Sequence, residues 1–310
     1  MIQRGKRRTL GTMLARLFFA ISLTLAGCGD DATSDGGRDG GTLRDGGDVA
    51  DAGGRDGAAP TDAGPGTDGG TVVPELPPAN GMLDYELGAA YPPPAGVVVV
   101  SRDRNAAPAP GIYNICYVNG FQTQPDERAF WMTEHPDLLL RDGGGALVID
   151  PDWDEIILDV TTPAKRTALA AIVGGWIEGC AADGFDAVEI DNLDTYSRSG
   201  GLVSANDAVA FMRLLSDRAH ARGLAIAQKN STDVLGRRAE MATDFAVAEE
   251  CNRYSECDAY TAVYGAQVYV IEYRRTDFDA GCRDFPELSI VLRDLQLRGP
   301  GSASYVYDGC

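Results

Sequence analysis

The sequence of 310 residues predicts an α/β fold, a (β/α)8 TIM barrel over residues 79–310, preceded by a signal peptide and a disordered Asp/Gly-rich linker. Three observations predict this organisation. Eight short segments rich in β-branched and other apolar residues follow one another after residue 79. Helical patterns stand between several of them, as in a barrel of alternating strands and helices. A segment of about 230 residues is also long enough for one substantial core.

The predicted strands are short and are separated by turn residues. They cover residues 84–87, 97–100, 113–118, 156–159, 187–190, 224–228, 245–248 and 267–272. Residues 163–183 and 206–222 show the clearest helical patterns, and each is followed by glycine and then by a strand. The first two connections are too short or too rich in proline for complete helices. The apolar residues 305–307 are a candidate for an extra strand.

Residues 1–27 have the pattern of an export signal. They contain five basic residues and no acidic one, and their apolar run at 17–26 is too short for a comfortable membrane span. The sequence Leu25-Ala26-Gly27-Cys28 resembles the lipobox of bacterial lipoproteins, in which the cysteine becomes acylated. We therefore expect an exported protein, anchored by lipid on Cys28 to a membrane of the bacterial cell envelope or to the cell surface. The alternative is an ordinary signal peptide with a chance cysteine.

Residues 28–78 consist of Asp-Gly-Gly, Arg-Asp-Gly and Ala-Gly pieces with almost nothing apolar to bury. This composition predicts a disordered, flexible tether. The recurring aspartates also raise the alternative of calcium binding. The repeats lack the regular ligand spacing and the closing glutamate of a calcium loop, so the tether is favoured.

The charge of the chain excludes several classes of protein. There are 27 Lys and Arg against 46 Asp and Glu, a net charge of −19, and residues 73–310 alone carry 36 acidic and 19 basic residues. A nucleic-acid partner is not expected, because binding to phosphates requires basic side chains. With only two histidines, His135 and His220, we expect neither a His-rich metal site nor a Ser/His or Cys/His nucleophile. No metal and no cofactor is predicted, and we expect a monomer.

Six cysteines follow Cys28, and in an exported protein an even number favours disulfides. Six cysteines allow fifteen pairings, so the spacing alone cannot decide among them. We predict that Cys251 pairs with Cys257, closing a short loop after a strand, and that Cys282 pairs with Cys310, fastening the C-terminal end. Two alternatives stay open for the remaining residues: Cys116 and Cys180 either pair or are small buried apolar side chains.

Acidic residues stand at the C-terminal ends of the predicted strands, where barrel enzymes carry their reactive groups. They are Asp159, Glu189, Asp191, Asp194, Glu249, Glu250 and Glu272, and Lys229-Asn230 ends another strand. Any one acid can be a helix cap or a solvated loop charge, but clustering at one rim is hard to obtain by chance. Two carboxylates without histidine suit glycoside hydrolysis, in which one protonates the leaving oxygen and the other attacks the anomeric carbon or activates water.

Several short motifs occur in a fixed order, at residues 84–87, 116–119, 186–196, 219–224, 229–230, 245–257 and 270–273. The most specific are Glu-x-Asp-Asn-x-Asp-x-Tyr at 189–196 and Glu-x-Cys-x-x-Tyr-x-x-Cys at 249–257. With these motifs the chain resembles glycoside hydrolase family 114, the endo-α-1,4-polygalactosaminidases, from about residue 80 to residue 310. The resemblance implies a (β/α)8 barrel.

The resemblance also implies roles for individual residues. The two catalytic carboxylates fall on Asp191 and Glu249, on the fifth and seventh predicted strands, with Asp191 as nucleophile and Glu249 as general acid and base; this division of roles stays open. The other residues that the resemblance places at the substrate are Asp159, Glu189, Asn192, Asp194 and Glu272 in the cleft, Tyr117 and Tyr196 as ring faces for sugars, and Lys229 and Asn230 as partners of carboxylates or hydroxyls. Glu189 can instead be a buried ion-pair partner of Lys229, and Tyr254 can simply pack on the disulfide.

The expected function is endo-acting, retaining cleavage of α-1,4-linked galactosamine-rich exopolysaccharide. An acidic cleft suits this partner, because galactosamine units with free amines are cationic near neutral pH. The chain departs from the family pattern in the first predicted strand, where many members have a tryptophan and Asp84-Tyr85-Glu86 stand here, and at Asn119-Gly120, where Ser or Ala followed by Gly is usual, so the exact sugar specificity stays open. The alternatives are a non-catalytic polysaccharide-binding lipoprotein and a metal-assisted hydrolase that uses the Asp cluster.

Overall fold

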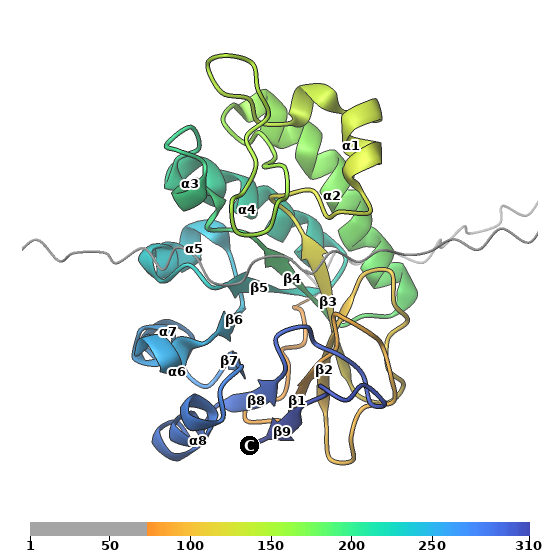
Figure 1. Ribbon diagram of the computed structural model, residues 1–310, viewed down its shortest axis with the longest axis vertical. Helices are drawn as coiled ribbons and strands as arrows, with labels where there is room; N and C mark the ends of the chain where they lie inside the picture. Colours follow the sequence, from red (N-terminus) through yellow and green to blue (C-terminus); the bar gives the residue numbers. More distant parts are fainter. Residues whose placement is uncertain (1–72) are drawn as a thin grey trace, which may run out of the picture. The chain divides into compact units, whose positions relative to one another are not determined.

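The computed structural model describes residues 73–310 (Figure 1). The predicted signal peptide at 1–27, the acylation site Cys28 and the linker up to residue 72 lie outside the described residues. No helix within residues 73–310 combines the length and the apolar character needed to cross a bilayer.

Eight parallel strands pair in sequence order and form a nearly closed barrel, which confirms the predicted fold class (Figure 1). They are β1 (Leu83–Tyr85), β2 (Val99–Asp103), β3 (Tyr113–Asn119), β4 (Ala187–Asp191), β5 (Ala225–Lys229), β6 (Phe245–Glu249), β7 (Val268–Glu272) and β8 (Ser289–Arg293). A ninth strand, β9 (Tyr307–Gly309), pairs antiparallel with β8 and also lies beside β1. The fully buried Arg293 of β8 donates to Asp84 of β1 at 2.6 Å, which joins the last parallel strand to the first.

The helices lie between β3 and β8. They are α1 (Arg128–Glu134), α2 (Pro163–Asp183), α3 (Thr195–Arg198), α4 (Ala205–Ala221), α5 (Arg238–Met241), α6 (Cys251–Tyr254), α7 (Cys257–Tyr264) and α8 (Arg275–Asp284), with the 3-10 turns η1 (Pro136–Leu138) and η2 (Thr232–Arg237). The long helix α2 begins at the cap Thr162, and it ends at Gly184, whose φ of 93° is the left-handed conformation that favours glycine. Within the described residues the β1–β2 and β2–β3 connections contain no helix, as their prolines predicted.

The strand predicted at 156–159 is wrong. These residues make only isolated antiparallel bridges, such as Ile149 with Ile156 and Gln122 with Ile157, in the long segment between β3 and α2. They are apolar because they are buried in a cluster with α2 and α4, outside the barrel wall. The fourth barrel strand is therefore the one at 187–191, and Asp191 and Glu249 lie on β4 and β6 instead of the fifth and seventh strands.

The eighth barrel strand, β8, was not predicted. It is a short run of five residues after Pro286, and its periodicity is too brief to separate it from a loop. The extra strand expected at 305–307 is present but shifted, because β9 covers Tyr307–Gly309.

Side chains alternate between the inside and the outside of the barrel wall, as strand geometry requires. Odd-numbered residues of β3 to β7 fill the barrel interior, for example Ile115, Ala187, Val247 and Ile271. Even-numbered residues of the same strands pack against the outer helices in two further clusters. This parity decides which residues at the carboxyl ends of the strands enter the mouth of the barrel.

Three disulfides lie outside the barrel interior. Cys251 is bonded to Cys257 and Cys282 to Cys310, which are the two predicted pairs. The pairing of Cys116 with Cys180, which the sequence left open, is also present. Since Cys116 is an even-numbered residue of β3, its sulfur faces α2, which carries Cys180.

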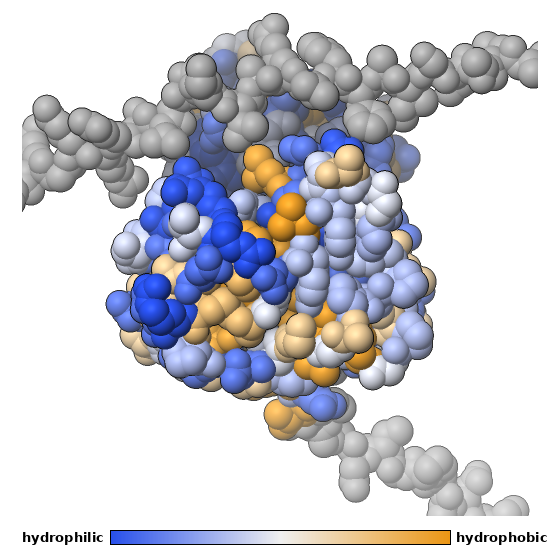
Figure 2. All heavy atoms as spheres, turned by 60° about the horizontal axis from the view of Figure 1, so that its bottom comes forward, coloured by the Kyte–Doolittle hydropathy of each residue, from blue (hydrophilic) through white to orange (hydrophobic). Residues whose placement is uncertain are grey.

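Polar side chains cover most of the face drawn in Figure 2, and apolar side chains form small patches between them. Few large apolar side chains are strongly exposed among the described residues. Trp153 is 66% exposed, and Tyr254 in the segment after β6 is 53% exposed. Tyr254 stacks on Arg253 with its ring centre 5.1 Å away, so its ring has a partner within the protein.

Candidate active site

Lys229 is at the centre of a polar network inside the mouth of the barrel. The side chain is only 2% exposed, and its Nζ lies 2.9 Å from Glu189 Oε1 and 2.6 Å from the hydroxyl of Tyr85. The same Nζ lies 3.7 Å from Asp191 Oδ1 and 3.8 Å from Glu249 Oε2. These residues have the inward parity of β1, β4, β5 and β6, so four strands bring them to one point.

The carboxylates of Asp191 and Glu249 therefore both approach the ammonium of Lys229. Asp191 Oδ1 and Glu249 Oε2 lie at most about 7.5 Å apart, the limit set by their distances of 3.7 Å and 3.8 Å to the shared ammonium. That limit admits the separation of about 5–5.5 Å in retaining glycosidases and the lower part of the range of about 6.5–9.5 Å in inverting ones. The two side chains are 22% and 30% exposed, so both are open to solvent and to a ligand.

Each of these two carboxylates has hydrogen-bond donors of its own. The hydroxyl of Tyr117 on β3 donates to Asp191 Oδ2 at 2.8 Å. Glu249 accepts from the hydroxyl of Tyr273, and from Asn230 Nδ2 at 3.3 Å. The oxygen of Asn230 accepts in turn from the backbone N–H of Glu249 at 2.8 Å, which fixes the amide orientation. The donors hold both carboxylates in one rotamer before any substrate arrives.

The electrostatics of the network keep Lys229 charged. Burial works to lower the pKa of its ammonium, but the three surrounding carboxylates outweigh burial and hold that pKa well above the usual value. Burial, followed by the charge of Asp191, raises the pKa of the Tyr117 hydroxyl well above its usual value. Burial and then Glu249 do the same for Tyr273. Both tyrosines are therefore neutral hydrogen-bond donors at physiological pH.

Three of the predicted residues lie next to the network on the segment after β4. Asn192 has a left-handed φ of 66°, and its Oδ1 accepts from Arg198 at 3.1 Å. Asp194 forms an ion pair with the same arginine at 2.6 Å. The hydroxyl of Tyr196 donates to Asp233 at 2.7 Å. Arg198 thus organises this edge of the site, and the ring of Tyr196 is half-buried.

Two predicted cleft residues lie elsewhere. Asp159 is in the loop before α2, where it contacts Lys165 and Thr161, and the proximity of their donors lowers the pKa of its carboxyl against the effect of burial. Its expected place depended on a strand at 156–159 that does not form. Glu272 is on β7, but it has the even parity of Val270 and faces the outer layer, where its Oε1 accepts from the backbone N–H of Asn252 at 2.9 Å.

The buried Glu272 provides a test of this outward placement. Among the described residues its Oε2 has no hydrogen-bond partner, and burial raises the pKa of the carboxyl to about 7 from 4.5. The folded protein therefore binds a proton that the unfolded chain releases, so stability falls as the pH rises from 4.5 to about 7. In Glu272→Gln, which keeps the acceptor for Asn252, we expect a Tm a few degrees above wild type at pH 8.

Differential scanning calorimetry of wild type and Glu272→Gln at pH 5 and pH 8 checks this expectation. At pH 5 the wild-type carboxyl is protonated, so the difference in Tm shrinks towards zero. An equal difference at both pH values would contradict the assignment of a raised pKa to Glu272.

Four residues at the site were not predicted as site residues. They are Tyr85, Asn119, Glu155 and Tyr273. Tyr85 and Tyr273 have the inward parity of β1 and β7, so strand alternation was the signal that could have selected Tyr273 in place of its neighbour Glu272. Glu155 could not have been found in this way, because it lies on the turn before Ile156, outside any barrel strand.

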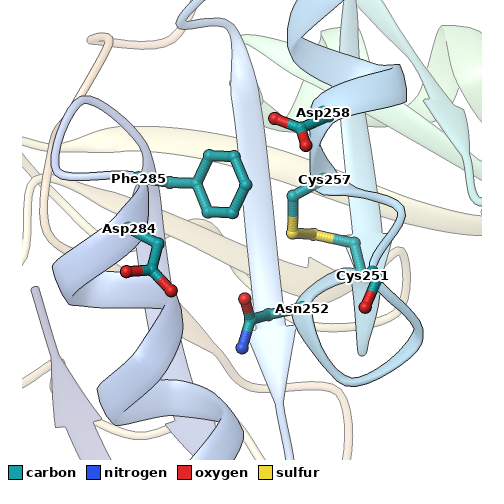
Figure 3. Close-up of a pocket in the computed structure, with 7 residues that line it drawn as sticks. Cys251, Asn252, Cys257, Asp258, Asp284 and Phe285 are labelled. Atoms are coloured by element: carbon teal, nitrogen blue, oxygen red, sulfur yellow. A yellow bond between two sulfur atoms is a disulfide. The ribbon is translucent and has the colours of Figure 1, made fainter.

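A separate pocket lies on the helix side of β7 (Figure 3). It has a volume of about 360 Å³ and is lined by Cys251, Asn252, Ser255, Cys257, Asp258, Asp284 and Phe285. Figure 3 shows the disulfide between Cys251 and Cys257 on one side and Phe285 on the other. Neither Asp191 nor Glu249 lines this pocket, so it is not the candidate active site.

Within residues 73–310 there is no group of three or more His, Cys, Asp or Glu side chains arranged to hold a metal ion.

Comparisons with known proteins agree with this geometry. Residues 67–310 match the glycoside-hydrolase family GH114. Among solved structures, the chain is similar to Aspergillus fumigatus Ega3 in complex with galactosamine, with a TM-score of 0.62, 22% identity, and 77% of this chain and 99% of that chain covered. It is also similar to a variant of the glycoside hydrolase domain of PelA from Pseudomonas aeruginosa, with a TM-score of 0.50, 14% identity, and coverage of 72% and 98%. Comparison with curated protein sequences finds no match.

A barrel that presents two carboxylates at the carboxyl ends of β4 and β6, together with the family match, defines the chain as a glycosidase. The chain belongs to glycoside hydrolase family GH114. The resemblance that the motifs at 189–196 and 249–257 predicted is thereby confirmed.

Proposed function

We propose that this glycosidase is an endo-acting, retaining enzyme that cleaves α-1,4-linked galactosamine-rich polysaccharide, with Asp191 and Glu249 as its catalytic pair. The observation that carries the proposal is the convergence of both carboxylates on Lys229 Nζ, at 3.7 and 3.8 Å, in a mouth open to solvent. Two carboxylates within this limit are compatible with the pair that glycoside hydrolysis requires.

The chemistry proceeds in two displacements. Asp191 attacks the anomeric carbon, and the bond from that carbon to the bridging oxygen breaks while Glu249 gives its proton to the leaving oxygen. Water then attacks the glycosyl-enzyme ester from the other side of the same centre, Glu249 takes the proton of the water back, and Asp191 is released. Asp191 accepts a hydrogen bond from Tyr117 at 2.8 Å and lies 3.7 Å from the ammonium of Lys229, and these contacts position its carboxylate, which supports its role as nucleophile.

The substrate class is supported by charge. Residues 73–310 carry a net charge of −17, and three carboxylates surround the one ammonium of the network. A polymer of galactosamine with free amines is cationic and is drawn to such a mouth. The similarity to Ega3, whose structure holds galactosamine, favours the same sugar in this chain.

We also propose export and lipid anchoring. The basic and apolar pattern of residues 1–27 and the lipobox-like sequence ending in Cys28 support secretion followed by acylation. Three disulfides in the barrel domain support an oxidising compartment outside the cytoplasm. In this arrangement residues 28–78 act as a flexible tether between the lipid and the enzyme.

A direct assay tests the proposed function. The purified protein is incubated with fully deacetylated, partly deacetylated and fully acetylated α-1,4-galactosamine polymer, and new reducing ends and product lengths are measured over time. We expect a rapid fall in mean chain length in the polymers with free amines, because an endo-acting enzyme cuts within the chain. Binding without any new reducing ends would contradict hydrolysis and favour the polysaccharide-binding alternative.

A further inference from the structure

We propose that the turn at residues 150–155 is a substrate-binding element, in which Trp153 stacks on one hexosamine ring of the polymer and Glu155 accepts a hydrogen bond from the ammonium group of another. The inference rests on the proposed function, because it assigns the part of the mouth that holds the polymer beside the reacting bond. The turn lies in the long segment between β3 and α2, outside the family motifs recognised in the sequence.

The turn ends close to Asp191. Glu155 Oε2 accepts from Asn119 Nδ2 at 3.0 Å, and Asn119 is the last residue of β3, in register with Asp191 on β4. The carboxyl of Glu155 is half-buried and sufficiently close to Asp191 for the two charges to interact. Glu155 therefore lies on the β3–β4 side of Asp191, at the mouth of the barrel.

The turn is rigidly anchored. Its first residue, Asp150, is fully buried and accepts from Gln122 at 2.6 Å and from Arg198 of α3 at 2.5 Å. The backbone N–H of Asp150 donates to the carbonyl of Glu155 at 2.8 Å, which closes the turn. In Figure 1 this yellow-green segment runs beside α3, in agreement with the ion pair to Arg198. Preorganisation of this kind is what a binding platform requires.

The tip of the turn presents an indole ring to solvent. Trp153 is 66% exposed, whereas Trp131 is fully buried and Trp176 packs between Trp131 and Arg104. The fold gains little from an exposed indole, but the apolar face of a sugar and an ammonium group both bind well to a tryptophan ring. The exposed carboxylates of Asp152 and Asp154 stand on either side of it and favour a cationic sugar over a neutral one.

Steady-state kinetics of the full protein test the element on deacetylated polymer and on its N-acetylated form. In Trp153→Ala we expect KM for the deacetylated polymer to rise about tenfold with a much smaller change in kcat, and Trp153→Phe to recover most of the loss. In Glu155→Gln we expect the preference in kcat/KM for the deacetylated over the acetylated polymer to fall about tenfold. Trp176→Phe, the same chemical change on the outer helix α2, is the matched control and keeps wild-type kinetics.

Fluorescence in an Asp191→Asn background gives a readout without turnover. Acrylamide is expected to quench the fluorescence of the exposed Trp153, and bound deacetylated polymer is expected to protect it. The same protection is expected when Trp176→Phe is added.

Unchanged KM in Trp153→Ala together with unprotected fluorescence would overturn the role of Trp153, and an unchanged preference in Glu155→Gln would overturn that of Glu155. If wild type cleaves the polymer while all variants match it, only this inference fails; if wild type neither binds nor cleaves any galactosamine polymer, the proposed function fails with it.

Discussion

Asp191→Asn and Glu249→Gln are each expected to lower the rate of polymer cleavage by about 1000-fold or more, because each removes one of the two carboxyl groups that the reaction needs. Both substitutions preserve the size of the side chain and one accepting oxygen, and both side chains are partly exposed. The Tm is therefore expected to stay within a few degrees of wild type. Reducing-end assays and calorimetry on the same preparations measure the two quantities.

A matched carboxylate away from the site separates catalysis from general effects of charge. Asp258 is exposed on α7 and lines the outer pocket, so Asp258→Asn is expected to keep wild-type activity. Full activity in either Asp191→Asn or Glu249→Gln would contradict the proposed mechanism.

Azide rescue decides which of the two residues is the nucleophile. Azide is added to Asp191→Ala and to Glu249→Ala with an activated α-galactosaminide as substrate. The variant that lacks the nucleophile gives a glycosyl azide of inverted configuration, and the variant that lacks the general acid and base gives one of retained configuration.

Lys229→Met is expected to lose both stability and activity. The variant keeps the length of the side chain but leaves Glu189, which is fully buried, without its cationic partner at 2.9 Å. Removal of one partner from a buried ion pair costs about 3–5 kcal/mol, whereas an exposed pair contributes about 0–1 kcal/mol. Arg213→Met, which breaks the exposed pair with Asp217 at 2.8 Å, is therefore the control and should leave the Tm nearly unchanged.

A second substitution separates the two losses in Lys229→Met. With Glu189→Gln added, the uncompensated buried charge is removed, and we expect most of the stability to return. Activity is not expected to return, because Asp191 and Glu249 still lack the ammonium of Lys229 that lies close to both. Chemical denaturation and cleavage assays on the single and double variants measure both effects. Equal stability of the single and double variants would show that the charge of Glu189 is not what destabilises Lys229→Met.

The part of the site that could be predicted from the sequence consists of residues that lie close together on one strand. Glu189 and Asp191 are two residues apart on one strand and therefore had to share a face, and the structure places both beside Lys229. The barrel itself followed from the alternation of apolar segments with helices, and the lack of helices before β3 followed from proline content. These features are local, so one sequence is enough to specify them.

The other features of the fold and the site could not be predicted, because they depend on tertiary contacts. The apolar residues 156–158 fit the pattern of a buried strand equally well, but packing on α2 places them outside the barrel wall. Glu272 and Tyr273 are neighbours, and only the register of β7 decides which of them faces inward. Glu155 accepts a hydrogen bond from Asn119, which lies 36 residues earlier in the chain, and no periodicity in the sequence indicates this contact.

The contact between β1 and β8 bears on the order in which the barrel folds. Asp84 and the guanidinium of Arg293 meet from positions 209 residues apart, and β9 beside them ends one residue before the C-terminus. A nascent polypeptide cannot form this contact until residue 293 has been synthesised, and contacts between residues so far apart in the sequence form slowly. The barrel is therefore expected to close late in folding, after neighbouring strands have paired in sequence order.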